Sequence, residues 1–216
     1  MIPGVYRDGF PAARGDEAKR LSIEQHVFAD FRLLAAGLIS PPPSAIDLYF
    51  VQQHYGLPTR LLDRTTNPLA GRYFAVNTGP DTDGSVVMMD VYRLAETQGA
   101  VGHFRGIVNS TDPRLREWLA PVLEWGEPED FCDYVVPLRP EQLNTRVRLQ
   151  RGCFTLHVPE RPALTEREND SLRTFVVPKG HKEAVYRELK LSGIDEFAIF
   201  GDLENLAVSL KAAYGL

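Results

Sequence analysis

The sequence has few cysteines and no long apolar run, and both shortages narrow the class of protein. Only two cysteines, Cys132 and Cys153, occur in 216 residues. This count does not indicate a disulfide-rich secreted scaffold, and no CxxC pair indicates zinc. No apolar stretch approaches the ~20 residues that cross a bilayer, and residues 1–10 lack the basic and apolar regions of a signal peptide. We therefore expect a cytoplasmic protein with no membrane segment and no metal site.

The common catalytic motifs are also missing. The chain has no GxxxxGK[ST] loop for phosphates, no GxSxG elbow and no HExxH zinc helix. A net charge of -5 and a pI near 5.6 give no overall attraction to nucleic acid. A local basic surface would need the arginines of the second half to share one face, and these are Arg139, Arg146, Arg148 and Arg151.

The composition is that of an ordinary globular domain, with 44% hydrophobic and 25% charged residues. Helix signals dominate the first half. Residues 22–38 place Ile23, Val27, Phe31 and Leu34 on one helical face, with Ser22 as the expected N-cap. Further helix starts are expected at Ser44 with Asp47, and at Asn67-Pro68.

Strand signals dominate the second half, in short segments rich in β-branched and aromatic residues. We therefore predict an α+β fold, in which a helical N-terminal half packs on a mainly antiparallel sheet from the C-terminal half, as a single domain over residues 1–216. The predicted strands are 85–94, 131–138, 145–150, 152–159, 173–178 and 196–200, and the predicted later helices are 113–125, 182–193 and 202–214.

The densest group of polar signals is "QHYGLPTRLLD", residues 53–63. Gly56 suits the left-handed position that ends a helix, and Pro58 prevents the helix from continuing. Thr59 can bond the backbone of the turn, and Arg60 can pair with Asp63 if the segment turns helically. Two interpretations stay open: a buried ion pair that fixes a corner, or a pocket in which Arg60 offers its planar fork to a phosphate or carboxylate.

Residues 53–76, "QHYGLPTRLLDRTTNPLAGRYFAV", resemble the signature of FRG-domain proteins, a bacterial family of largely unassigned function. "RLQRGCFTLH" at 148–157 and "GIDEFAIFGDLENLA" at 193–207 are similar to two later stretches of that family. The chain departs from the family pattern where Arg64 replaces a tryptophan and Gly201 replaces a proline. The Phe-Arg-Gly motif that names the family is not found before the signature, so we expect either that the domain lacks its first strand or that Tyr6-Arg7 takes the place of the motif.

A further resemblance is to ADP-ribosyltransferases, which implies NAD as cofactor. In that alignment Arg7 is the first element, Tyr55 or Thr59 the middle element, and Gln150 the last, with His54 and Arg60 as further ligand-binding residues. A glutamine cannot act as a general base, so Gln150 would orient the ribose and the nucleophile. Gly56, Pro58 and Asp63 are then structural residues.

Three hypotheses follow. The chain is an NAD-using enzyme acting as a toxin or phage-defence effector, with Tyr55, Thr59, Arg60 and Gln150 converging on a cleft. Alternatively, it is a non-catalytic module that binds a ligand or a protein partner. The third hypothesis, nucleic-acid binding, requires the arginines at 146, 148 and 151 to join Arg139 on one face.

Overall fold

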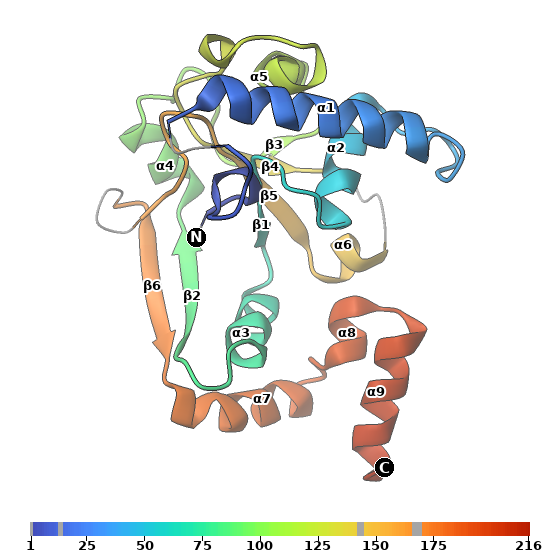
Figure 1. Ribbon diagram of the computed structural model, residues 1–216. Coiled ribbons are helices and arrows are strands. Elements are labelled where there is room, and N and C mark those ends of the chain that lie inside the picture. Colours follow the sequence, from blue (N-terminus) through green and yellow to red (C-terminus); the bar gives the residue numbers. More distant parts are fainter. Residues whose placement is uncertain (1, 13–14, 142–144, 166–169) are drawn as a thin grey trace.

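A four-stranded sheet forms the centre of the upper part of the protein (Figure 1). The computed structural model describes residues 2–12, 15–141, 145–165 and 170–216. The second strand in spatial order runs antiparallel to both of its neighbours, and the last two strands pair in parallel. In spatial order the strands are β1 (Leu61–Thr65), β5 (Gly152–Leu156), β4 (Val136–Arg139) and β3 (Val108–Asn109).

Helices cover the apolar face of this sheet. Since side chains alternate along a strand, Leu61 on β1 and Phe154 and Leu156 on β5 share this face, and all three belong to the largest core cluster. The covering helices are α1 (Glu17–Ala35), α2 (Ala45–His54) and α5 (Arg114–Leu123). The 3₁₀ turns η1 (Gly4–Tyr6) and η2 (Pro128–Asp130) come before α1 and after α5 in the chain.

The lower part of the protein contains a two-stranded antiparallel sheet and a second group of helices (Figure 1). Its main core cluster is centred on Ala70, Tyr73, Val76, Leu189 and Ile199.

The remaining elements of the whole protein are α3 (Pro68–Asn77), β2 (Gly84–Met89), α4 (Val91–Thr97), α6 (Thr145–Leu149), β6 (Leu172–Val177), η3 (Lys179–His181), α7 (Lys182–Leu191), α8 (Glu196–Phe200) and α9 (Leu203–Tyr214).

The predicted α+β class is confirmed, and so are two of the local signals that begin helices. The Ser44 hydroxyl accepts a hydrogen bond from the Asp47 backbone N–H at 3.1 Å. Asn67 accepts from Leu69 N–H at 3.0 Å, with Pro68 at the first helical position. These bonds join residues two or three positions apart, which is why the sequence alone predicts them.

Two predicted strands are helices. Residues 145–149 form α6, so alternation does not place Arg146 and Arg148 on one face, and Arg146 lies over the Phe200 ring instead. Residues 196–200 form α8, which Asp195 begins by accepting from Ala198 N–H and which Gly201 ends at φ 69°. Short apolar runs are ambiguous between strand and helix, and for α8 the flanking caps favour the helix.

The predicted face of the first helix is only partly buried, although Phe31 packs against the largest core cluster. The helix begins earlier than expected, since Asp16 rather than Ser22 caps it. Leu34 is exposed, and the buried face instead carries Leu21 and Phe28 together with the polar side chains Glu24 and Gln25. The helix therefore turns a carboxylate toward the core. Within the described ranges, none of the helices combines the length and apolar character that crossing a bilayer requires.

Candidate functional site

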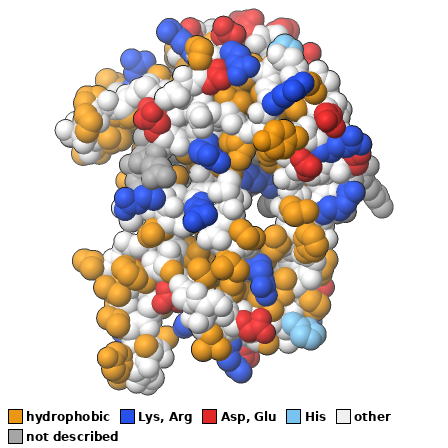
Figure 2. Space-filling model, turned by 180° about the vertical axis from the view of Figure 1, so that it is seen from behind, with side chains coloured by type: hydrophobic (Ala, Val, Ile, Leu, Met, Phe, Trp, Pro, Cys, Tyr) orange, Lys and Arg blue, Asp and Glu red, His pale blue; other side chains and the backbone are white. Residues whose placement is uncertain are grey.

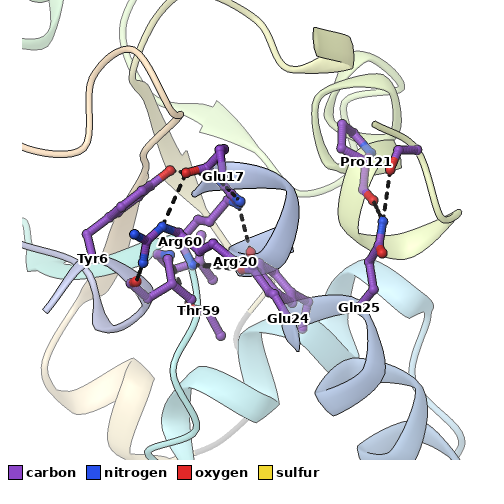
Figure 3. Close-up of polar contacts among 12 residues, drawn as sticks. Tyr6, Glu17, Arg20, Glu24, Gln25, Thr59, Arg60 and Pro121 are labelled. Carbon is purple, nitrogen blue, oxygen red and sulfur yellow. Dashed lines mark hydrogen bonds and ion pairs between the residues drawn. The ribbon is translucent and has the colours of Figure 1, made fainter. Parts of the chain in front are cut away.

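Arg60, the arginine of the 53–63 turn, is enclosed by the protein. Its side chain is 0% exposed and lies between α1, the η1 turn and the start of β1 (Figure 3). A buried arginine keeps its charge, so the surrounding groups must supply both opposite charge and hydrogen-bond acceptors. The residues that do so come from the first two helices and the N-terminal turn.

Each guanidinium nitrogen of Arg60 has a partner inside the protein. Nε donates to Glu24 at 2.7 Å, Nη2 donates to Glu17 at 2.6 Å, and Nη1 donates to the Tyr6 hydroxyl (Figure 3). The guanidinium carbon also lies 4.1 Å from the centre of the Phe131 ring. The planar fork that could hold a phosphate or carboxylate is thus occupied by the protein's own side chains.

Glu24 is the acceptor at the centre of the cluster and is itself fully buried. Besides Arg60 Nε, it accepts from the Arg60 backbone N–H at 3.1 Å and from the Tyr49 hydroxyl at 2.5 Å. A second cation, Arg20, donates to the Val5 carbonyl at 2.5 Å and so attaches the N-terminal turn to α1. The Glu24 carboxylate therefore connects α1, α2 and the residue that precedes β1.

The charges of the cluster balance, since the cations of Arg20 and Arg60 face the carboxylates of Glu17 and Glu24. Burial raises the pKa of the Glu24 carboxyl, and the nearby Arg60 guanidinium opposes that rise. Burial alone would lower the pKa of Arg60, but Glu24, Tyr6 and Glu17 outweigh it and raise this pKa. The guanidinium is therefore held in its charged form.

Burial also raises the pKa of the Tyr6 and Tyr49 phenols, so both stay protonated and act as hydrogen-bond donors or acceptors. Neither is a candidate base, because the proton of each phenol is held more tightly than in water. The cluster has the chemistry of a structural ion-pair network.

The turn before Arg60 brings the N-terminal segment into place. Gly56 has φ 81°, as predicted for the position that ends α2. The Val5 backbone N–H donates to the Thr59 carbonyl at 3.3 Å. A Cβ added to Gly4 would lie only 2.9 Å from Pro58 Cα, so this position requires glycine's small size.

The predicted pairing of Arg60 with Asp63 is wrong. The segment continues as strand β1 rather than as a helix, and residues three apart on a strand point to opposite faces. Asp63 instead accepts from the Gln53 amide at 2.7 Å, and Gln53 accepts from the Thr59 hydroxyl at 2.6 Å. These three side chains hold the turn on its outer side.

The remaining predicted site residues are not gathered around Arg60. Tyr55 is exposed and contacts only the edge of the neighbouring His54 ring among the aromatic contacts of the described residues. Partial burial and the Arg146 cation lower the pKa of His54. Arg7 is exposed, and its Nε donates to the Ile2 carbonyl at 3.0 Å.

Gln150 lies at the far end of β1. Its carbonyl accepts from the Thr65 hydroxyl at 2.6 Å, whereas Arg60 precedes Leu61 at the start of the strand. Five strand residues span about 16 Å, so Gln150 and Arg60 do not meet in one cleft. The buried Nε2 of Gln150 has no hydrogen-bond partner among the described residues.

Two cavities lie elsewhere. One of about 240 Å³ is bordered by Phe104, Asn109 and Arg114, and one of about 320 Å³ by Leu33 and Trp125. Neither contains a residue predicted for the site. In the parts of the chain that the structure describes, no three His, Cys, Asp or Glu side chains are placed to hold a metal ion.

The opposite face of the sheet carries a second buried polar row. Arg64 donates to the Thr155 hydroxyl at 3.4 Å, and that hydroxyl lies 3.0 Å from His157 Nε2. His157 Nδ1 lies 3.2 Å from the Arg161 carbonyl, so Nδ1 carries the proton and Nε2 accepts from Thr155. Burial, aided by the Arg64 cation, lowers the pKa of His157 to about 3 and keeps the ring neutral.

Sequence reasoning missed the partners of Arg60, which lie 36, 43 and 54 positions away at Glu24, Glu17 and Tyr6. One signal could have identified the first of them. Leu21, Glu24 and Phe28 follow the i, i+3, i+7 spacing of a buried helix face. A glutamate at such a position needs a buried cation.

Comparison with known families identifies one domain. Residues 2–84 match the family model of the FRG domain. The match includes every ion-pair partner of Arg60 described above, whereas β5 and β4 lie beyond it. The stretches 148–157 and 193–207, which resemble later parts of the family, also lie outside the matched residues. No curated protein and no solved structure gave a significant match to the chain.

Proposed function

Given that this is an FRG-domain protein, we propose that it is a non-catalytic protein-binding module in which the signature residues hold the scaffold together. The observation that carries the proposal is the enclosure of Arg60. Its side chain is fully buried, and its three guanidinium nitrogens donate one hydrogen bond each, to Glu24, Glu17 and Tyr6.

A ligand-binding role for Arg60 would require these bonds to break. An incoming phosphate would have to displace Glu17 and Tyr6 from a buried cation and leave a carboxylate without its partner. Removing one member of a buried ion pair costs about 3–5 kcal/mol, and this cost would be subtracted from any binding energy. The cluster therefore favours a structural role over recognition of NAD.

Exposed apolar side chains favour a protein partner. Leu33, Leu34 and Leu38 lie exposed at the end of α1, next to the cavity bordered by Trp125. Hydrophobic side chains also gather on the lobe at the lower left of Figure 2. Contiguous apolar surface of this kind marks protein–protein contacts more often than it marks sites for polar cofactors.

An NAD-using, ADP-ribosyltransferase-like activity, with a role as a toxin or phage-defence effector, stays a prediction. Gln150 is the residue through which this activity can be tested. Its amide Nε2 is buried without a hydrogen-bond partner among the described residues, so replacing the side chain by alanine breaks no hydrogen bond of that nitrogen.

The test is calorimetric titration of the folded protein with NAD, alongside the Gln150→Ala and Tyr55→Phe variants. We expect no saturable heat for any of the three proteins at millimolar NAD. Saturable binding to the unaltered chain that is lost in a folded Gln150→Ala variant would refute the non-catalytic proposal. The Tyr55→Phe variant tests the other predicted catalytic residue, since Tyr55 is exposed and its hydroxyl is removed without changing the ring.

A further inference from the structure

Helix α9 is the least covered apolar element of the protein. Apart from Glu204, Asn205, Ser209 and Lys211, its 12 residues are apolar, yet none of them is buried. It packs on α8 and extends away from the rest of the molecule (Figure 1). A 12-residue helix is marginal in water without tertiary packing, and an apolar helix is normally covered.

Four of the exposed apolar residues of α9 form one stripe. Leu203, Ala207, Leu210 and Tyr214 recur at the i, i+4, i+7, i+11 spacing of a single helix face. Leu203, Leu210 and Tyr214 are 82%, 49% and 77% exposed. Ser209, on another face, accepts from the Phe197 backbone N–H of α8. The stripe is therefore separate from the face that packs on α8.

The charges beside the stripe indicate what covers it. Glu204 and Lys211 are seven residues apart, so they lie along the same side of the stripe, one near each end of the helix. Seven residues are too many for an ion pair within one helix. When two such helices pair antiparallel, Glu204 of each faces Lys211 of the other, whereas parallel pairing brings no opposite charges together.

We propose that the stripe of α9 binds the same stripe of a second copy of this chain, in an antiparallel, two-fold symmetric helix pair. Leu203 then packs against Tyr214 of the second copy, and Ala207 against Leu210 of the second copy. Two ion pairs between Glu204 and Lys211 flank the contact. The inference rests on the proposed function, because it names the partner of the binding module.

The contact is small. A stable interface buries about 800 Å² on each partner, and a single helical stripe of four residues buries less. We therefore expect a dimer that forms and dissociates with protein concentration. Because the contact is isologous, it stops at two copies and does not extend into a filament.

The experiment is sedimentation equilibrium of the full chain in low salt, between about 5 and about 500 µM because interfaces of this size are weak. The expected result is a mass that rises from monomer to dimer. Leu210→Glu should weaken association at least about tenfold, since it places a charge at the centre of the apolar stripe. Leu191→Glu, at a leucine outside α9 that is even more exposed than Leu210, should leave it unchanged.

Two single variants test the antiparallel geometry. Glu204→Lys leaves only cations along the side of the stripe, and Lys211→Glu leaves only anions, so each should dimerise several-fold more weakly. Mixed in equal amounts, the two variants should associate at least as well as the unaltered chain, because each then supplies the charge that the other lacks. Circular dichroism checks that α9 stays helical in both.

A protein that stays monomeric over the whole range overturns the inference, and so does a dimer that Leu210→Glu does not weaken. Failure of the mixed variants to associate overturns the antiparallel arrangement. These measurements contain no nucleotide, so they stand apart from the NAD titration: NAD binding refutes the proposed function, and a monomeric mass refutes only this inference.

Discussion

Replacing Glu24 by glutamine removes one charge from the buried cluster while keeping the shape of the side chain. The Glu24 carboxylate accepts from Arg60 Nε, from the Arg60 backbone N–H and from the Tyr49 hydroxyl. A glutamine keeps one acceptor oxygen but turns an N–H₂ group toward donors. The Arg60 cation then depends on Glu17 alone for opposite charge.

The expected loss is large. Breaking a buried ion pair by removing one partner costs about 3–5 kcal/mol. Because Glu17 still contacts Arg60, we expect Glu24→Gln to lower the free energy of unfolding by about 3 kcal/mol, the lower end of that range. A typical domain is stable by only about 5–15 kcal/mol. With a urea dependence of about 1–3 kcal/mol per molar, the unfolding midpoint should fall by about 1–3 M.

The assay is equilibrium urea unfolding at pH 7, followed by the fluorescence of Trp118 in α5, which packs against the helix that carries Glu24. Glu17→Gln should cost less, because the Glu17 side chain is 19% exposed and water can reach it. Glu183→Gln, from an exposed surface pair with Arg187, should leave the midpoint unchanged. A loss below about 1 kcal/mol for Glu24→Gln, or one no larger than that of Glu17→Gln, would contradict the structural role assigned to the cluster.

Two further outcomes follow from the buried groups near the sheet. The folded state holds the pKa of His157 at about 3 against an ordinary value of 6.5, so below pH 6.5 the unfolded chain takes up a proton that the folded chain does not. The free energy of unfolding should therefore fall by up to about 1.4 kcal/mol per pH unit as the pH drops from 6.5 towards 3. Urea unfolding of the unaltered chain and of His157→Asn at several pH values isolates this effect. Parallel curves of unfolding free energy against pH for the two proteins would contradict it. Burial raises the pKa of the Cys132 and Cys153 thiols to about 11, so both should react far more slowly with a thiol reagent at pH 8 in the folded protein than in urea. Equal rates in the two states would show that the thiols are accessible.

Much of the fold could be predicted because its signals are local. Ser44, Asn67 and Gly56 each act on backbone groups within a few positions, and the structure has each of them at a helix boundary. The later helices α7 and α9 and the strands β2, β5 and β6 lie within the predicted ranges, give or take a residue at their ends. Residues 91–94, the end of the predicted strand 85–94, belong to helix α4. The wrongly predicted strands α6 and α8 are five-residue segments, which are too short for periodicity to separate strand from helix.

By itself the sequence determined the α+β class, the turn at Gly56 and Pro58, and the resemblance of residues 53–76 to the FRG signature. Only the tertiary structure decided what Arg60 does. A buried guanidinium pairs with the carboxylates that the fold brings within hydrogen-bond distance. Here these are Glu17 and Glu24 on α1, rather than Asp63 three positions away. Local bonds depend on spacing along the chain, whereas a buried ion pair depends on how distant segments pack.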